Sequence, residues 1–313
     1  RILGDPLRDQ SLLFSTLFSG IGTFSDKIKI LQLNQRLKKK TVTDIFLEPE
    51  ETTISYLNGL GFSKDMIDNF FRPFFSGIFL ENKLETSSRM FVFIYKMFGE
   101  GNAALPKAGI EAIPKQLHQK LNHSTFKFHS EVATINDNEI LLTNGDRIPS
   151  DFTIVATAAS GLIKNLKNQS ISWQSCDTLY FETETRCINK TLIGLIPDKK
   201  ALINNIFYPS SLKMSNPKKK QLLSVTLVGT HNLCEEKLTD RVLWELKEYC
   251  GIDSCTFIKR YRIPRALPKL ANLQYEMSPS ETRLNQQIFL AGDTQLNGSL
   301  NAAMLSGESA AMG

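Results

Sequence analysis

The sequence contains few histidines and cysteines, and their scarcity excludes several kinds of site. Four histidines and five cysteines occur in 313 residues, and no two cysteines form a CxxC pair. No zinc-binding spacing can be drawn from this set. An odd number of cysteines without such a motif favours free thiols in a reducing compartment, so we expect a cytoplasmic protein. No cysteine lies in a context that would activate it as a nucleophile.

Long apolar runs are also missing. No run approaches the ~20 residues needed to span a bilayer, and no signal peptide is visible. The net charge of +5 fits a weak attraction to anionic surfaces, which allows peripheral membrane contact, but it does not indicate a nucleic-acid partner. Nothing in the sequence indicates an oligomeric state. Arg1 is not a natural start residue, so we expect the chain to continue upstream.

What is present is an ordinary globular composition, with 42% hydrophobic and 22% charged residues. The length suggests two lobes. Residues 1–105 predict mainly helices: 26–40, 43–60 and 63–71, with Ser63 as an N-cap. The aromatic segment that follows, 70–79, favours a core between helices, and the alternative is that part of it lines an apolar cavity.

The predicted secondary structure changes near residue 105, from mainly helices to a mixture of helices and strands. Apolar residues at 110, 113, 117 and 121 predict one face of a helix, and Asn144-Gly145 predicts a hairpin turn. We expect a second helix over 237–249. The predicted strands cover residues 126–135, 139–142, 152–155, 178–184, 191–196, 203–208, 222–229 and 257–263.

The stretch IFLAGDTQLNGSLNAAMLSGESAA, residues 288–311, combines a short apolar strand, a turn with one acid and a small-residue helix. The carboxylate of Asp293 can accept hydrogen bonds from sugar or ribityl hydroxyls. The first N–H groups of the helix have no partner within it and attract a ligand oxygen. The alternative is a simple packing unit in which Ser299 caps the helix.

This stretch resembles the C-terminal FAD motif of the flavin amine oxidase superfamily, which includes amine oxidases, protoporphyrinogen oxidases and phytoene desaturases. Four further blocks resemble the same family in the expected order, so the resemblance covers most of the chain from about residue 60. They are FFRPFFSGIFL with the central region at 85–117, SEVATI at 130–135, FTIVATAAS at 152–160 and RYRIPRALPKL at 260–270.

The resemblance implies a mixed α/β fold in which a partial, Rossmann-type FAD lobe is interleaved with a substrate lobe of helices and antiparallel sheet. The FAD lobe would comprise residues 106–165 and 280–313. The substrate lobe would comprise the helical residues 1–105 and the sheet residues 166–279.

FAD is the cofactor that the resemblance implies. The backbone of Val132 would meet the adenine, Asp293 the ribityl or pyrophosphate region, and the N–H of Leu300 or Asn301 the pyrimidine edge of the flavin. The complete candidate set for cofactor binding is Val132, Thr157, Gly292, Asp293, Ser299, Leu300 and Asn301. No side chain is assigned as catalytic.

One element of the family is missing: the strand-GxGxxG-helix unit that holds the pyrophosphate. Gly20-Ile-Gly22-Thr-Phe-Ser25 comes nearest, but a helix-like segment precedes it and Ser replaces the third glycine. A turn between helices is favoured over a phosphate loop.

The implied activity is removal of hydrogen from a small apolar substrate, isoprenoid or porphyrinogen-like. Ser299 stands where amine oxidases usually have an aromatic residue, which weakens the amine interpretation. Candidate lining residues are Phe74, Phe75, Met90 and Tyr95. The alternatives are an amine oxidase, an isomerase that uses reduced flavin, or a cofactor-free binding or scaffold module.

Overall fold

The computed structural model describes residues 20–101, 104–163, 166, 171–212 and 220–313. The chain divides into two compact units. Unit 1 comprises residues 1–41, 49–108 and 174–267, and unit 2 comprises residues 42–48, 109–173 and 268–313. The assignment of a cofactor lobe and a substrate lobe remains a prediction.

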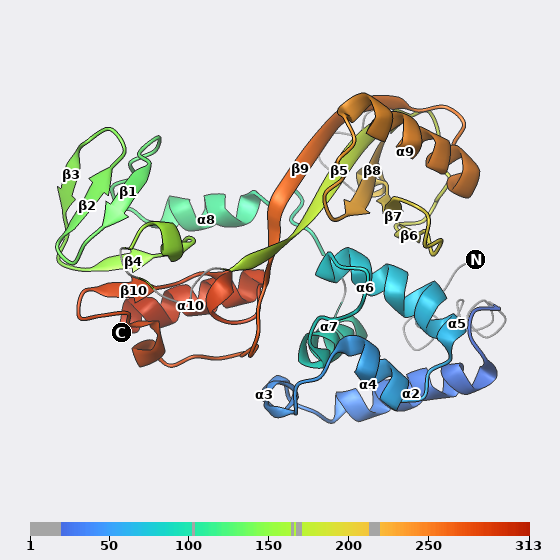
Figure 1. The fold of residues 1–313 in the computed structure, drawn as a ribbon, viewed down its shortest axis with the longest axis horizontal. Coiled ribbons are helices and arrows are strands. Elements are labelled where there is room, and N and C mark those ends of the chain that lie inside the picture. Colours follow the sequence, from blue (N-terminus) through green and yellow to red (C-terminus); the bar gives the residue numbers. More distant parts are fainter. Residues whose placement is uncertain (1–19, 102–103, 164–165, 167–170, 213–219) are drawn as a thin grey trace. The chain divides into compact units, whose positions relative to one another are not determined.

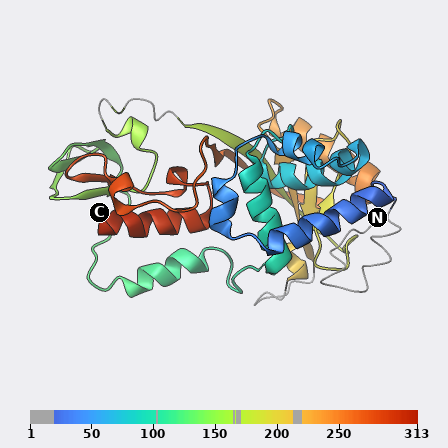
Figure 2. The same ribbon diagram turned by 90° about the horizontal axis from the view of Figure 1, so that it is seen from below.

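The helical part of unit 1 is built around phenylalanines. Phe71, Phe75 and Phe91 are fully buried, and the rings of Phe75 and Phe91 lie 4.6 Å apart. The core interpretation of this segment therefore holds for these rings. Helix α2 lies against α7 (Figure 2). Buried Lys96 of α7 donates to the carbonyl of Leu37 at 2.9 Å. The helices are α2 (Phe24–Lys38), α4 (Thr53–Gly59), α5 (Lys64–Met66), a π-helical turn (Ile67–Phe71), α6 (Arg72–Phe79) and α7 (Ser88–Glu100).

The sheet of unit 1 has five strands in the order β6-β7-β8-β5-β9 (Figure 1). Its alternation is strict along β8, where every second residue is buried against α9. This face forms a large aliphatic core that includes Leu223, Val225, Val242 and Leu246. The elements are β5 (Ser172–Thr183), β6 (Gly194–Leu195), β7 (Ile203–Phe207), a 3₁₀ turn (Pro209–Ser211), β8 (Gln221–Val228), α9 (Glu235–Cys250) and β9 (Thr256–Lys269).

Unit 2 contains a three-stranded antiparallel sheet, order β1-β2-β3, and a parallel pair, β4 and β10. Its core is small and centres on Ile135, Val155, Ile288 and Leu290. The elements are α3 (Val42–Leu47), α8 (Ala112–Lys120), β1 (Val132–Ile135), β2 (Glu139–Leu142), β3 (Arg147–Pro149), β4 (Thr153–Val155), β10 (Ile288–Leu290), α10 (Leu300–Met312) and 3₁₀ turns at Ala159–Gly161, Pro279–Thr282 and Asp293–Gln295.

Several predicted elements are wrong in extent, among them two strands that are six residues longer: β5 begins at Ser172 instead of Thr178, and β9 ends at Lys269 instead of Ile263. The helix over 43–60 is two helices, because Pro49 disfavours helical geometry at Glu48. The strand over 126–135 begins only at Val132, because Phe126 packs against His118 of α8, with the ring centres 4.2 Å apart, instead of joining the sheet. The strand over 191–196 shortens to Gly194–Leu195.

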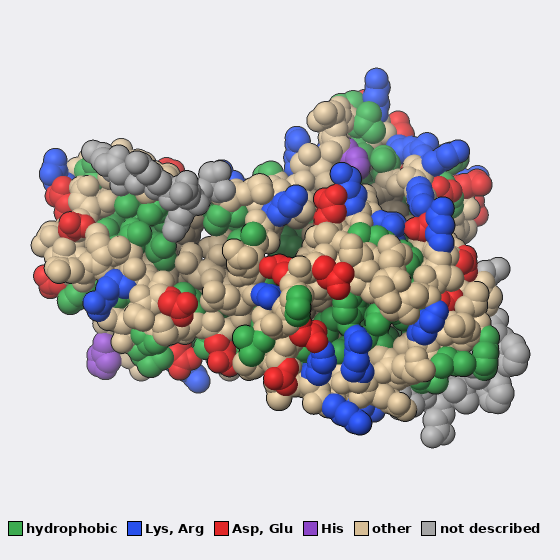
Figure 3. Space-filling view, turned by 60° about the horizontal axis from the view of Figure 1, so that its bottom comes forward, with side chains coloured by type: hydrophobic (Ala, Val, Ile, Leu, Met, Phe, Trp, Pro, Cys, Tyr) green, Lys and Arg blue, Asp and Glu red, His purple; other side chains and the backbone are tan. Residues whose placement is uncertain are grey.

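Among the described residues, no helix has both the length and the hydrophobicity to cross a bilayer. Figure 3 shows basic and acidic side chains interspersed over the face in view. All five cysteines are free, and burial raises the pKa of Cys250 to about 12, which keeps this thiol protonated.

Candidate functional site

The parallel strands β4 and β10 of unit 2 bring the segments 152–160 and 288–311 to one edge of the sheet. Because β4 and β10 run in the same direction, with Leu290 opposite Val155, their carboxyl ends coincide. The Ala291 N–H donates to the Val155 carbonyl at 3.0 Å, which continues the pairing to the ends of both strands. Thr157 and Gly292 therefore emerge together, at the edge where ligands bind in open parallel sheets.

The conformation of Gly292 is fixed by a side chain that the sequence did not single out. Its φ of 121° is one that L residues rarely adopt. The Ser306 hydroxyl, fully buried in α10, accepts from the Gly292 N–H and donates to the Gly292 carbonyl, both at 2.9 Å. This contact fastens the strand end to the helix and aims the following turn.

Asp293 begins a short loop that closes on itself. The Gly298 N–H, at a φ of 72°, donates to the Asp293 carbonyl at 2.9 Å. The Asp293 carboxylate is half-buried, yet it accepts no hydrogen bond from any residue that the structure describes. It is therefore free to accept hydrogen bonds from the hydroxyls of a ligand.

Ser299 is the N-cap of α10, as the alternative of a simple packing unit assumed. Its hydroxyl accepts from the Ala302 N–H at 3.1 Å and donates to the Asn297 side-chain oxygen at 2.7 Å. The N–H groups of Leu300 and Asn301 have no acceptor among the described residues, and both residues are exposed. The helix thus presents two unsatisfied donors and the positive end of its dipole.

Asn297 and Ser309 complete the attachment of this helix, and sequence reasoning missed both. The Asn297 amide donates to the Gln274 carbonyl at 2.9 Å, and the Ser309 hydroxyl donates to the Met277 carbonyl at 3.2 Å. The only signal in the sequence was the abundance of small polar residues in the segment.

Val132 begins β1 opposite Leu142 and packs against the apolar cluster beneath β4 and β10. It therefore belongs to the same core as the strand ends that carry Thr157 and Gly292. Taken together, unit 2 offers free backbone donors, one free carboxylate and a glycine in a conformation that other residues rarely adopt, at the carboxyl edge of a parallel sheet. These groups fit the hydroxyl-rich, anionic chain of a dinucleotide.

The other glycine-containing turn, at Gly20–Gly22, donates its backbone N–H groups to two carboxylates of the protein. The Gly22 N–H donates to the Asp65 carboxylate at 2.6 Å, and the Thr23 N–H donates to Asp26 at the same distance. A Cβ on Gly22 would lie 2.6 Å from the Met66 side chain. Two carboxylates already bind the donors that a phosphate would need and would repel it, so this segment is a packing turn. The helix-like segment before it lies outside the described residues.

The predicted lining residues lie on two helices of unit 1. Phe75 is fully buried in the aromatic cluster, while Phe74 is partly buried and stacks on Phe70 at 6.0 Å. Met90 and Tyr95, both on α7, are partly buried. None of the four lines either of two cavities in unit 1, of about 330 and 530 Å³.

The face of the five-stranded sheet away from α9 has its own apolar hollow, of about 530 Å³. The rings of Tyr180 and Tyr261 meet edge to face at 5.8 Å, and the Lys259 ammonium lies 4.8 Å from the centre of the Tyr261 ring. No carboxylate lines this hollow. Its lining residues are Thr178, Tyr180, Leu222, Ile258, Lys259, Tyr261 and Ile263.

Comparisons with solved structures establish the fold. An oxidoreductase from Methanosarcina mazei matches 93% of this chain and 73% of its own, with a TM-score of 0.69 and 14% identity. A protein assigned as a protoporphyrinogen oxidase from Exiguobacterium matches 94% of this chain and 73% of its own, with a TM-score of 0.65 and 15% identity. UDP-galactopyranose mutase matches 79% of this chain and 62% of its own, with a TM-score of 0.53 and 15% identity.

No curated protein matches the sequence significantly. The family model described as flavin containing amine oxidoreductase matches residues 4–312, almost the whole chain. The mixed α/β fold and the resemblance recognised from the sequence are thereby confirmed. The chain belongs to the flavin containing amine oxidoreductase family and is therefore a flavin-dependent oxidoreductase.

Proposed function

We propose that this protein uses FAD, held by unit 2, to remove hydrogen from an apolar substrate bound by unit 1. The single observation that carries the cofactor part is the turn after β10. There, the free carboxylate of Asp293 and the free N–H groups of Leu300 and Asn301 follow one strand end fixed by Ser306.

These groups have complementary tasks toward FAD. The Asp293 carboxylate would accept hydrogen bonds from ribityl hydroxyls, and the N–H groups at the positive end of α10 would hold the pyrimidine edge. Bound FAD would supply the hydride acceptor. The positive end of the helix favours negative charge there and so favours the reduced cofactor. The protein itself would bind and orient the cofactor and the substrate, which agrees with the lack of an assigned general base.

The apolar hollow on the sheet of unit 1 supports the substrate class. Tyr180, Tyr261 and Leu222 offer flat and aliphatic surface. Lys259 would repel a protonated amine, and no lining carboxylate would attract one. These features favour a neutral, planar or extended substrate over an amine.

The cofactor proposal is tested on the purified full-length protein. We expect a flavin absorption spectrum, and FAD when the cofactor is released and identified by chromatography. Asp293→Asn should weaken FAD binding about tenfold or more, because hydrogen bonds to a charged acceptor contribute about 1.5–3 kcal/mol. The control is Asp151→Asn, an exposed acid just before the amino end of β4, which should leave the affinity unchanged.

The substrate proposal needs a separate experiment. Under anaerobic conditions, a polyene or a porphyrinogen should bleach the flavin colour, while a panel of amines should not. Hydrogen peroxide released with an amine would overturn the apolar assignment, and product without net electron transfer would indicate an isomerase. A full-length protein that takes up no FAD would overturn the whole proposal in favour of a binding or scaffold module.

A further inference from the structure

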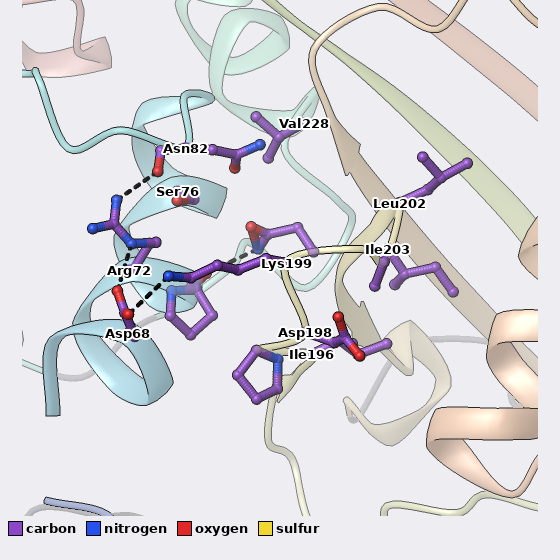
Figure 4. A pocket seen from close by; sticks show the side chains of 14 residues that line it. Asp68, Arg72, Ser76, Asn82, Ile196, Asp198, Lys199, Leu202, Ile203 and Val228 are labelled. Carbon is purple, nitrogen blue, oxygen red and sulfur yellow. Dashed lines mark hydrogen bonds and ion pairs between the residues drawn. The ribbon is translucent and has the colours of Figure 1, made fainter. Parts of the chain in front are cut away.

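Unit 1 contains a second cavity, of about 330 Å³, that shares no residue with the candidate flavin turn or the hollow on the sheet. One wall comes from the π-helical turn and α6, and the other from the loop before β7 and the start of that strand (Figure 4). Its size lies at the lower end of the range for small-molecule sites.

Two cations at this cavity share one carboxylate. Arg72 Nε donates to Asp68 at 3.1 Å, and Lys199 Nζ donates to the other oxygen of Asp68 at 2.8 Å (Figure 4). Both contacts lower the pKa of Asp68, although its partial burial alone would raise it, so this acid stays ionised. The cluster of three groups therefore carries one surplus positive charge.

Asp198 also lines the cavity and keeps its negative charge, but it does not occupy the donors of Arg72 and Lys199. The Asp198 carboxylate accepts from the Lys200 N–H at 2.8 Å and from the Tyr249 hydroxyl at 3.2 Å, and it points away from Arg72 (Figure 4). Arg72 also donates through Nη1 to the Asn82 carbonyl at 2.7 Å, while its Nη2 has no acceptor among the described residues. One guanidinium nitrogen and part of the Lys199 ammonium thus remain available to an anion.

Ser76 adds a second observation on the same wall. Its side chain lines the cavity, the residue is 1% exposed, and its hydroxyl has no hydrogen-bond partner. A buried hydroxyl without a partner is costly.

Half of the lining is apolar, which limits the kind of anion that fits. A bare inorganic ion would leave these side chains without contacts, whereas a short aliphatic body covers them. The apolar members are Pro73, Ile196, Pro197, Ala201, Leu202, Ile203 and Val228.

We propose that this cavity binds a small carboxylic acid that has a short aliphatic body and a hydroxyl group. Arg72 and Lys199 hold the carboxylate, the ligand hydroxyl meets Ser76, and Asp68 positions the two cations. The site is independent of the flavin, because none of its residues belongs to the candidate cofactor set.

Calorimetric titration of the full-length protein with three matched probes tests the ligand class. The probes are 2-hydroxy-4-methylpentanoate, 4-methylpentanoate and 2-hydroxy-4-methylpentanamide. The hydroxy acid should bind, the acid without the hydroxyl should bind about 3- to 10-fold more weakly, and the neutral amide should give no heat. Equal binding of acid and amide, or no heat from any probe at millimolar concentration, would overturn the proposal.

Substitutions with matched controls test the residues. Lys199→Gln should weaken binding of the hydroxy acid about tenfold. The control is Lys220→Gln, which removes an ion pair with Glu182 outside the cavity and should leave this binding unchanged. Ser76→Ala should weaken the hydroxy acid to the level of the acid without the hydroxyl. Thr239→Val removes another buried hydroxyl without a partner, away from the cavity, and should leave binding unchanged. Equal effects of each variant and its control would contradict the assignment.

Discussion

Two glycine-containing turns precede capped helices in this chain, and they have opposite chemistry. Before α2, Thr23 caps the helix and the carboxylates of Asp26 and Asp65 occupy the neighbouring N–H groups. Before α10, Ser299 caps the helix, and the N–H groups of Leu300 and Asn301 stay open. Both turns contain glycines with positive φ, so backbone shape does not distinguish them.

The difference lies in the backbone N–H groups of Gly22 and Thr23, just before α2, which carboxylates of the protein occupy. A protein carboxylate that binds these donors stabilises the fold and excludes an external anion. Donors left open make the same geometry a ligand site, at some cost to the stability of the free protein. The first turn should therefore matter to folding alone, and the second turn to both folding and cofactor.

The largest expected effect is at Asp26, which is 1% exposed and accepts from the backbone and side chains of both Thr23 and Ser63. Asp26→Ala leaves these donors without an acceptor, and we expect a loss of about 3 kcal/mol in the free energy of unfolding. Urea unfolding measures this. The control is Asp65→Ala, which exposes the Gly22 N–H to water and should cost less than about 1 kcal/mol.

Ser306→Ala tests the second turn. It removes both hydrogen bonds to Gly292, and we expect about 2 kcal/mol of destabilisation together with weaker FAD binding. Ser309→Ala, also buried but bonded to Met277 on another segment, should destabilise without changing FAD affinity. If both variants changed FAD affinity equally, the Gly292 contact would have no special role in the cofactor site.

These contrasts also show what the sequence could predict. The strand, turn and helix over residues 288–311 and the cap at Ser63 follow local patterns, so they were predicted correctly. The contacts that decide whether a turn is open to a ligand join residues far apart in the sequence. Asp65 lies 43 positions from Gly22, and Ser306 lies 14 positions from Gly292. No local periodicity encodes such pairs.

The same limit applies to cavities. The strands that carry Tyr180 and Tyr261 were predicted, but their ring contact depends on strand order, with β5 beside β9. Phe75 was assigned to a substrate cavity on composition alone, although tight packing with Phe91 buries it completely. A high density of aromatic residues indicates burial well, but it does not indicate whether a given ring packs in the core or lines a cavity.

Acid should weaken the first turn in a predictable pH range. Hydrogen bonds from Ser63 and Thr23 overcome the opposing effect of burial and lower the pKa of Asp26 from 3.8 to about 2. A depressed pKa in the folded state stabilises the protein above pH 4, and that contribution of about 2 kcal/mol disappears as the pH falls from about 4 to about 2. Unfolding at a series of pH values measures the slope, and Asp26→Asn should flatten it over this range. An unchanged slope in the variant would show that other acids dominate.

The smallest expected effect gives the sharpest distinction between the turns. The first turn of α10 has no acidic residue, and Asn301 is exposed there. Asn301→Asp places negative charge at the positive end of the helix, so the free protein should gain about 0.5 kcal/mol. The same charge would lie beside the pyrimidine edge of the flavin, so FAD affinity should fall and the reduction potential should become more negative. Asn301→Gln, which is neutral, should change neither quantity. A gain in stability without a loss of FAD affinity would remove α10 from the cofactor site, because an open helix N-terminus that binds no anion has only the solvent to satisfy it.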